Sequence, residues 1–138
     1  ATDHAPHAVE TKSKGFLKAP FGVIGLETAI GVTWKVMVEE EHMSISDWIA
    51  HWTTAPAALL GRPTPTLAPG AAADLVLIDP ATPWRVAPDR FRSLSRNTPF
   101  DGWTLHARAV LTVCEGRTTF VRATGGSPSS TAPTLLPL

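Results

Sequence analysis

The hydrophobic pattern changes its period partway along this 138-residue chain, and that change limits the folds open to it. Before residue 60 apolar residues recur mainly at helical spacing, whereas after residue 74 they alternate or form short runs typical of strands. Proline and glycine crowd into GRPTPTLAPG (61–70), which has the composition of a linker. We therefore expect helices first and strands second, in two structural units that meet near residues 61–70.

The segment LETAIGVTWKVMVEEEH (26–42) carries the first periodic pattern. One helical stripe holds the apolar residues Leu26, Ile30, Trp34, Met37 and Val38. However, apolar residues also alternate over 32–38 as they would in a strand. Of the two interpretations we prefer the helix.

A second helix is indicated by Ser44 and Asp47, whose spacing is that of a capping box. Apolar residues, Trp48 among them, then repeat at helical spacing. A further short helix is expected over APAALL (55–60), and Gly61 would end it because glycine tolerates a left-handed backbone.

The strand-like part begins with ADLVLIDP (73–80), a short apolar run that favours a strand buried on both faces. LHARAVLTV (105–113) then alternates, and Glu115-Gly116 can turn the chain into TTFV (118–121). This pattern predicts a β-hairpin.

Composition excludes several classes of partner. Twelve basic residues balance twelve acidic ones, so no net field attracts nucleic acid or an anionic membrane. No apolar run is long enough to span a membrane, and no signal peptide is recognisable. The single cysteine, Cys114, cannot form an intramolecular disulfide, and we expect it to be a small buried residue. Together these features favour a cytoplasmic protein.

The opening ATDHAPH (1–7) holds the candidate catalytic groups Asp3 and His7, followed by a glycine- and proline-punctuated loop over 11–25. An ionised aspartate can bind a cation and accept a proton, and a histidine can donate a hydrogen bond to an anionic substrate group. On spacing alone a structural interpretation, with Asp3 capping a turn and His7 in solvent, stays open.

Three segments, ATDHAPH, KAPFGVIGLETA (18–29) and SRNTPFDGW (95–103), resemble the C-terminal part of bacterial-type dihydroorotases of the amidohydrolase superfamily. The resemblance implies an α/β fold: the C-terminal end of a TIM-like (β/α)8 metal-dependent hydrolase barrel plus part of a small composite β-sandwich domain. Residues 1–62 would supply the last barrel strand, the active-site loop and helices, residues 63–122 part of the β domain, and residues 123–138 a Ser/Pro-rich disordered tail.

The resemblance also implies an activity, the zinc-dependent reversible hydrolysis of L-dihydroorotate to N-carbamoyl-L-aspartate in pyrimidine biosynthesis, with one or two zinc ions. Asp3 would be a metal ligand and the general base, His7 would bind the substrate carboxylate, and Phe21 and Gly22 would contact the pyrimidine ring. The family's other metal ligands would lie upstream, so we expect these 138 residues to be a C-terminal fragment that is inactive alone.

Two alternatives stay open. One is a non-catalytic homologue that scaffolds aspartate carbamoyltransferase, and the other is a related hydantoinase or allantoinase. A homodimer, or a complex with aspartate carbamoyltransferase, is a further expectation of the resemblance. NTPFDGW (97–103) distinguishes the family, but we assign it no chemical role, and Asn97 is interpreted as part of a turn.

Overall fold

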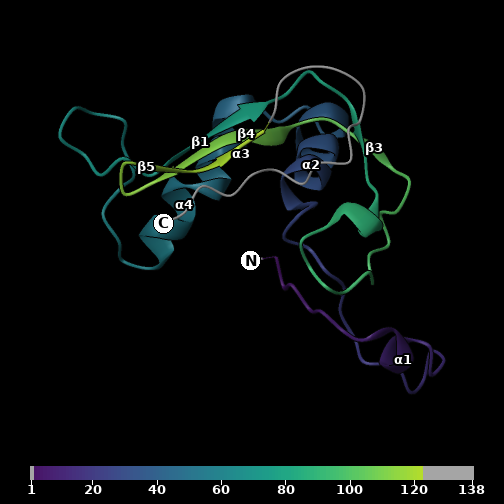
Figure 1. Cartoon of the computed structure of the whole chain (residues 1–138). Helices are drawn as coiled ribbons and strands as arrows, with labels where there is room; N and C mark the ends of the chain where they lie inside the picture. Colours follow the sequence, from purple (N-terminus) through teal and green to yellow (C-terminus); the bar gives the residue numbers. More distant parts are fainter. Residues whose placement is uncertain (1, 123–138) are drawn as a thin grey trace.

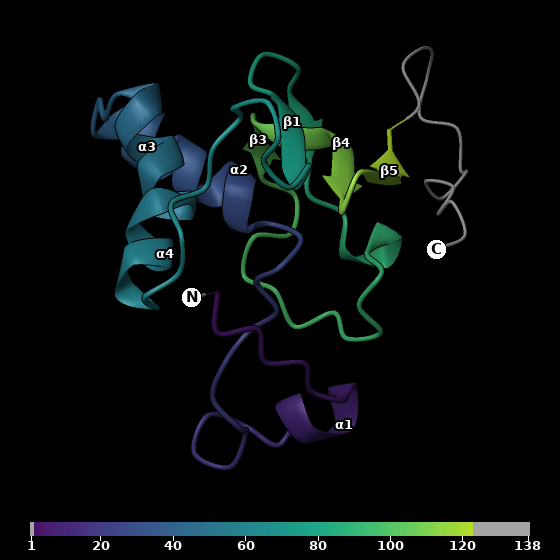
Figure 2. The ribbon, with the colours of Figure 1, turned by 90° about the vertical axis from the view of Figure 1, so that its left-hand side faces the viewer.

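The computed structural model describes residues 2–122, which combine short helices with two small antiparallel sheets (Figures 1 and 2). The elements in chain order are α1 (Val9–Lys12), α2 (Ala29–Thr33), η1 (Trp34–Glu40), α3 (Ile45–Trp52), α4 (Thr54–Leu59), β1 (Leu75–Asp79), β2 (Trp84–Arg85), η2 (Pro88–Arg90), β3 (Thr104–Leu105), β4 (Arg108–Cys114) and β5 (Arg117–Val121). None of the helices in this range is long and apolar enough to cross a membrane. The tail predicted for 123–138 lies outside the described residues.

The helix expected over 26–42 is confirmed, and the strand alternative is wrong. α2 continues directly into η1, which has π-helical hydrogen bonding, and the Glu41 N–H closes its end on the Val36 carbonyl at 2.9 Å. Trp34 is buried, as the stripe required. Leu26 precedes the helix and is exposed, so its place on the stripe was wrong.

The cap predicted for α3 is confirmed. The Ser44 hydroxyl oxygen accepts the Asp47 backbone N–H at 3.1 Å and lies 2.7 Å from the Asp47 carboxylate, to which it donates. α4 matches the short helix expected over 55–60 and ends before Gly61, whose φ of 62° is the left-handed conformation that glycine adopts easily.

The predicted hairpin is also confirmed, within a three-stranded antiparallel sheet of order β1-β4-β5. Glu115 and Gly116 both have positive φ, 50° and 77°, as a two-residue type I′ turn requires. Two details differ from expectation. β1 is not buried on both faces, because Val76 and Leu77 are 45% and 52% exposed. The predicted strand 105–113 is interrupted at Ala107, with a φ of 53°, so that β3 pairs with β2 instead.

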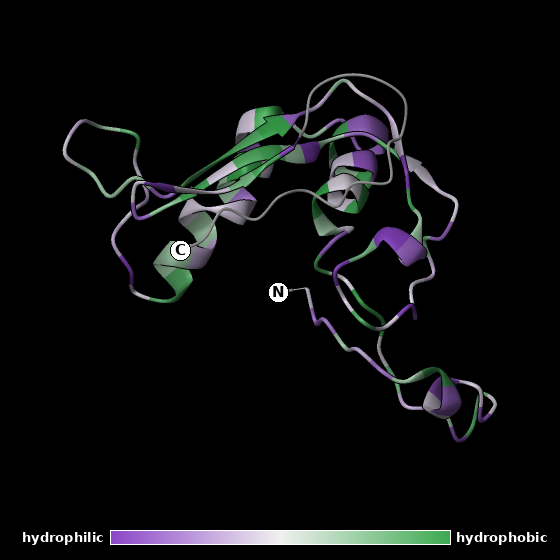
Figure 3. Cartoon of the chain, in the orientation of Figure 1, coloured by the Kyte–Doolittle hydropathy of each residue, from purple (hydrophilic) through white to green (hydrophobic). Residues whose placement is uncertain are grey.

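The hydrophobic core joins residues from both sides of the 61–70 segment. Trp34 and Trp48 pack edge to face, with ring centroids 5.2 Å apart, and Ala107 completes the buried cluster. Ile78 from β1 packs against it, and Figure 3 shows β1 and β4 as predominantly apolar strands. The helices and the main sheet therefore share one core, whatever domain boundary the whole protein has.

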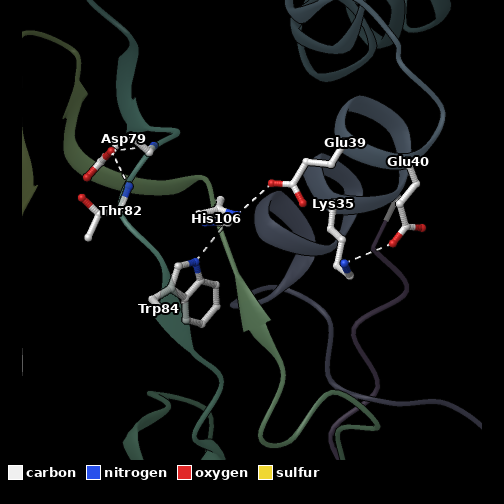
Figure 4. A network of polar contacts seen from close by, with 8 residues as sticks. Lys35, Glu39, Glu40, Asp79, Thr82, Trp84 and His106 are labelled. Atoms are coloured by element: carbon white, nitrogen blue, oxygen red, sulfur yellow. Dashed lines mark hydrogen bonds and ion pairs between the residues drawn. The ribbon is translucent and has the colours of Figure 1, made fainter.

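A network of polar contacts also links the helices before the 61–70 segment to the strands after it (Figure 4). The Glu39 carboxylate on η1 lies 2.9 Å from His106 Nδ1, and the Trp84 indole N–H donates to the His106 carbonyl at 3.4 Å. A second ion pair, Lys35 to Glu40 at 3.1 Å, stays within η1. The His106 contact links η1 to the β2–β3 pair.

Candidate active site

The opening segment lies beside the loop at 20–25, although the two are far apart in sequence. His4 forms a parallel β-bridge with Val23, and the Ala5 N–H donates to the Val23 carbonyl at 2.9 Å. α1 and the loop that follows it extend away from the helices and sheets in both views (Figures 1 and 2). The bridge therefore brings together the segment with Asp3 and His7 and the loop with Phe21 and Gly22.

Asp3 directly precedes the bridge, and its side chain is exposed within this chain. Its φ of 45° lies in the left-handed region, where a non-glycine residue is uncommon and aspartate is one of the more tolerant types. Such backbone strain often occurs at functional sites. The conformation is compatible with a catalytic role, which stays a prediction.

His7 contacts the candidate substrate loop directly. Its Nε2 lies 2.8 Å from the Phe21 carbonyl oxygen, and because that oxygen can only accept, Nε2 must carry the proton. A neutral ring then offers only a lone pair at Nδ1. To donate a hydrogen bond to a substrate carboxylate, His7 must take up a second proton or release Phe21.

Gly22 is confined by the opening segment. A Cβ built on Gly22 would lie 2.5 Å from the Ala5 Cβ and 3.9 Å from His7 Nε2, and Gly22 has a φ of 96°. Both facts require glycine for close packing inside the chain. Phe21, by contrast, leaves its side chain 91% exposed.

Two residues that the sequence had left without a specific role hold this loop in place. The Lys12 ammonium donates to the Pro20 and Gly22 carbonyls, each at 3.0 Å. His4 Nδ1 accepts the Gly25 N–H at 3.1 Å and the Leu26 N–H at 3.4 Å, so that this nitrogen is already engaged. Bonds of this kind between a side chain and the main chain leave no periodic signal in the sequence.

Asn97 is the third such residue, and it comes from the segment between η2 and β3. Its side-chain amide donates to the Ala5 and Gly22 carbonyls at 3.0 and 3.3 Å, so it touches both segments of the candidate site. The motif NTPFDGW could have drawn attention to it, but nothing in the spacing showed which backbone groups it would reach.

The described residues do not form a metal site by themselves. Among residues 2–122 there is no group of three or more His, Cys, Asp or Glu side chains that could hold an ion. Asp3 can therefore provide at most one ligand of a site completed elsewhere. An open hollow of about 440 Å³ is lined by residues 85–89, Arg96 and Asp101, and neither Asp3 nor His7 is among its lining residues.

Cys114 does not behave as expected from the sequence, because it is exposed rather than buried. Partial desolvation, and then the nearby carboxylates of Asp74 and Glu115, raise the pKa of its thiol above the ordinary value. A raised pKa disfavours the nucleophilic thiolate.

Comparison with known proteins shows the family to which the chain belongs. Residues 19–120 match the model of the amidohydrolase family, so the chain belongs to that family. More particularly, it is 48% identical over 120 residues to a dihydroorotase of Syntrophotalea carbinolica, covering 87% of this chain and 28% of that protein. It is 44% identical to a dihydroorotase of Pelotomaculum thermopropionicum, covering 85% and 27%. The resemblance inferred from the sequence is thereby confirmed.

Solved structures agree on the fold. An L-hydantoinase (dihydropyrimidinase) from Arthrobacter aurescens superposes with a TM-score of 0.76 at 33% identity, over 85% of this chain and 27% of that one. A D-hydantoinase (dihydropyrimidinase) from Thermus sp. gives 0.74 at 24% identity, over 87% and 27%. The chain thus spans little more than a quarter of the length of its relatives. Its described residues show mixed helices and strands, and contain no barrel.

Proposed function

We propose that the protein to which these residues belong is a dihydroorotase, a cyclic amide hydrolase that interconverts L-dihydroorotate and N-carbamoyl-L-aspartate in pyrimidine biosynthesis. The observation that carries the proposal is the contact of His7 Nε2 with the Phe21 carbonyl at 2.8 Å, next to Gly22. Three of the four residues that the resemblance implicates in catalysis or substrate binding therefore lie together. The identities of 48% and 44% to dihydroorotases support the same substrate.

The reaction is difficult because an amide carbonyl is a poor electrophile and neutral water a poor nucleophile. A bound zinc ion would supply the missing reactivity by polarising the carbonyl and by lowering the pKa of water to about 7. Asp3 would be one ligand, and the other ligands would come from outside the 138 residues, in line with a barrel and composite β domain in the whole protein.

Asp3 would also act as the proton carrier of the reaction. As a carboxylate it would accept a proton from the attacking water and deliver it to the ring nitrogen as the amide bond breaks. Its exposed side chain leaves both oxygens accessible for this transfer. In the reverse direction Asp3 would take the proton from the attacking nitrogen and deliver it to the departing hydroxide, which leaves as water.

His7 and the loop at Phe21 and Gly22 would bind the substrate. A doubly protonated His7 can donate from Nδ1 to the substrate carboxylate while Nε2 keeps its bond to Phe21. The ring of the substrate would then lie against the backbone of Phe21 and Gly22. Substrate recognition and the position of the loop would thus depend on one imidazole.

A hydantoinase is the second candidate, favoured by the TM-score of 0.76 and 33% identity to the Arthrobacter aurescens L-hydantoinase. Five-membered hydantoins lack the carboxylate that His7 would bind, which favours dihydroorotate. The scaffold alternative is less favoured because Asp3 and His7 are both present. A His-x-His pair in the upstream sequence would argue against a scaffold. Cytoplasmic location, a homodimer and association with aspartate carbamoyltransferase remain part of this proposal.

The test compares dihydroorotate, hydantoin and allantoin as substrates of the full-length protein. We expect dihydroorotate to be hydrolysed fastest, and Asp3→Asn to lower kcat by about 10²- to 10⁴-fold. The matched control is Glu10→Gln, which neutralises an exposed carboxylate on α1 and should leave kcat unchanged. Faster turnover of hydantoin or allantoin, or an Asp3→Asn variant with normal kcat, would contradict the proposal.

A further inference from the structure

Asn97 uses every hydrogen-bonding group of its side chain on the candidate site. The two donors of its amide nitrogen go to the Ala5 carbonyl at 3.0 Å and the Gly22 carbonyl at 3.3 Å. Its amide oxygen accepts the backbone N–H of His7 at 3.4 Å. Its backbone carbonyl accepts the backbone N–H of Ile24 at 3.1 Å. One residue thus connects the segment before His7 to the loop after Phe21.

The requirement for asparagine follows from this arrangement. Two main-chain acceptors and one main-chain donor have to be satisfied by one short planar group, and a carboxamide has two N–H donors beside one acceptor oxygen. Aspartate has nearly the same shape but would place a negative oxygen against the Ala5 and Gly22 carbonyls. Leucine would leave the Ala5 carbonyl and the His7 backbone N–H without the Asn97 partner, and the Gly22 carbonyl with its Lys12 bond alone.

The segment around Asn97 is fixed by further contacts of the same kind. The Ser95 hydroxyl donates to the His7 carbonyl at 3.0 Å. The Glu27 carboxylate accepts the backbone N–H groups of Arg92 and Ser93, each at 3.0 Å. Because Gly22 has no room for even one added carbon beside Ala5, the two segments that Asn97 joins are already in close contact.

We propose that Asn97 is a positioning residue that holds the segment containing His7 and the loop containing Phe21 and Gly22 in one fixed arrangement. The inference rests on the function proposed above, because it assigns those two segments to substrate binding. Asn97 acts through them and does not touch substrate itself. Its amide nitrogen donates to both the Ala5 and the Gly22 carbonyl, one in each segment.

The experiment uses the full-length protein with Asn97→Asp and the neighbouring control Thr98→Val. The Thr98 hydroxyl accepts only a local bond, from the Phe100 N–H at 3.3 Å, so its removal should leave the site unchanged. For Asn97→Asp we expect kcat/KM for dihydroorotate to fall by about 10- to 100-fold, mainly through KM, because a misplacement near 1 Å is enough for such a loss. Bound metal should stay at the level of the unsubstituted protein, and Tm should fall only slightly, because the lost bonds are confined to the contact of these two segments.

Amide hydrogen exchange provides a readout that does not depend on the substrate. Asn97→Asp should speed exchange at Ala5, whose N–H bonds to Val23 across the two segments, and at Ile24, whose N–H bonds to the Asn97 carbonyl. Thr98→Val should speed neither. Unchanged exchange and KM, or a general loss of protection together with a collapse in Tm, would overturn the positioning role. If the unsubstituted protein fails to hydrolyse dihydroorotate, the proposed function fails, and the exchange result alone still decides the role of Asn97.

Discussion

The contact between Gly22 and Ala5 leads to a quantitative prediction, because the two penalties of adding a methyl group there can be separated. Gly22→Ala would place its Cβ 2.5 Å from the Ala5 Cβ while keeping a φ of 96°. The left-handed backbone costs about 1–2 kcal/mol for an L-residue, and overpacking costs about 1–3 kcal/mol. We expect a total loss of about 2–5 kcal/mol in the free energy of unfolding.

A second substitution removes one penalty and leaves the other. Ala5→Gly deletes the methyl group that Gly22→Ala would strike, so the double variant should lose the steric term. It should keep the backbone term of about 1–2 kcal/mol, plus about 0.5–1 kcal/mol for the extra flexibility of glycine. The two substitutions should therefore couple favourably by about 1–3 kcal/mol. Gly15→Ala is the matched control, since Gly15 has a φ of 81° and nothing within 4 Å.

Urea unfolding of the full-length variants, followed by tryptophan fluorescence, measures these free energies by linear extrapolation. The kcat/KM for dihydroorotate, measured in parallel, reports whether the loop moves. A loss for the double variant equal to the sum of the losses for Gly22→Ala and Ala5→Gly alone would refute the steric argument. A loss for Gly15→Ala as large as that for Gly22→Ala would show that backbone strain alone explains the effect.

Two further predictions concern other elements. Ser44→Ala removes the acceptor of the Asp47 N–H and should lower the free energy of unfolding by about 1 kcal/mol, which is measured as a lower Tm. The control is Thr53→Ala, which should have a smaller effect because the Thr53 side chain forms no cap bond to α4. Bonds from the Thr82 side chain and from the Ala81 and Thr82 backbone lower the pKa of Asp79 below 3.8, so its stabilisation is present above pH 3.8 and lost as the pH falls through the lower folded pKa. Asp79→Asn should flatten this acid dependence of Tm, and an unchanged slope would contradict it.

The elements that could be predicted are those in which local chemistry determines the conformation. The Ser44 cap, the helix through Trp34 and the Glu115-Gly116 turn each depend on residues within a few positions of one another. Periodicity could not show the break at Ala107, because the alternation of apolar residues continues through it. Nor could it show that Val76 and Leu77 are exposed, since an apolar run does not say how much of the protein covers it.

The candidate site was predictable in its residues but not in its construction. The resemblance singled out Asp3, His7, Phe21 and Gly22, and three of these lie close together. The bonds that assemble them are made by Lys12, His4 and Asn97 to backbone atoms. Asn97 reaches Ala5 over 92 residues, and a side-chain bond to a distant backbone carbonyl leaves no repeating pattern in the sequence. Only the folded arrangement shows it.

The connector between α4 and β1 differs from the rest of the described chain, because residues 61–74 are all exposed. The helices and strands on either side meet through Trp48 and Ala107 in the core and through Asn97 at the candidate site, and neither meeting point uses the connector. A backbone nick there would leave two polypeptides with complementary surfaces. We therefore expect that pieces ending and beginning within the connector, expressed separately, reassociate through these contacts.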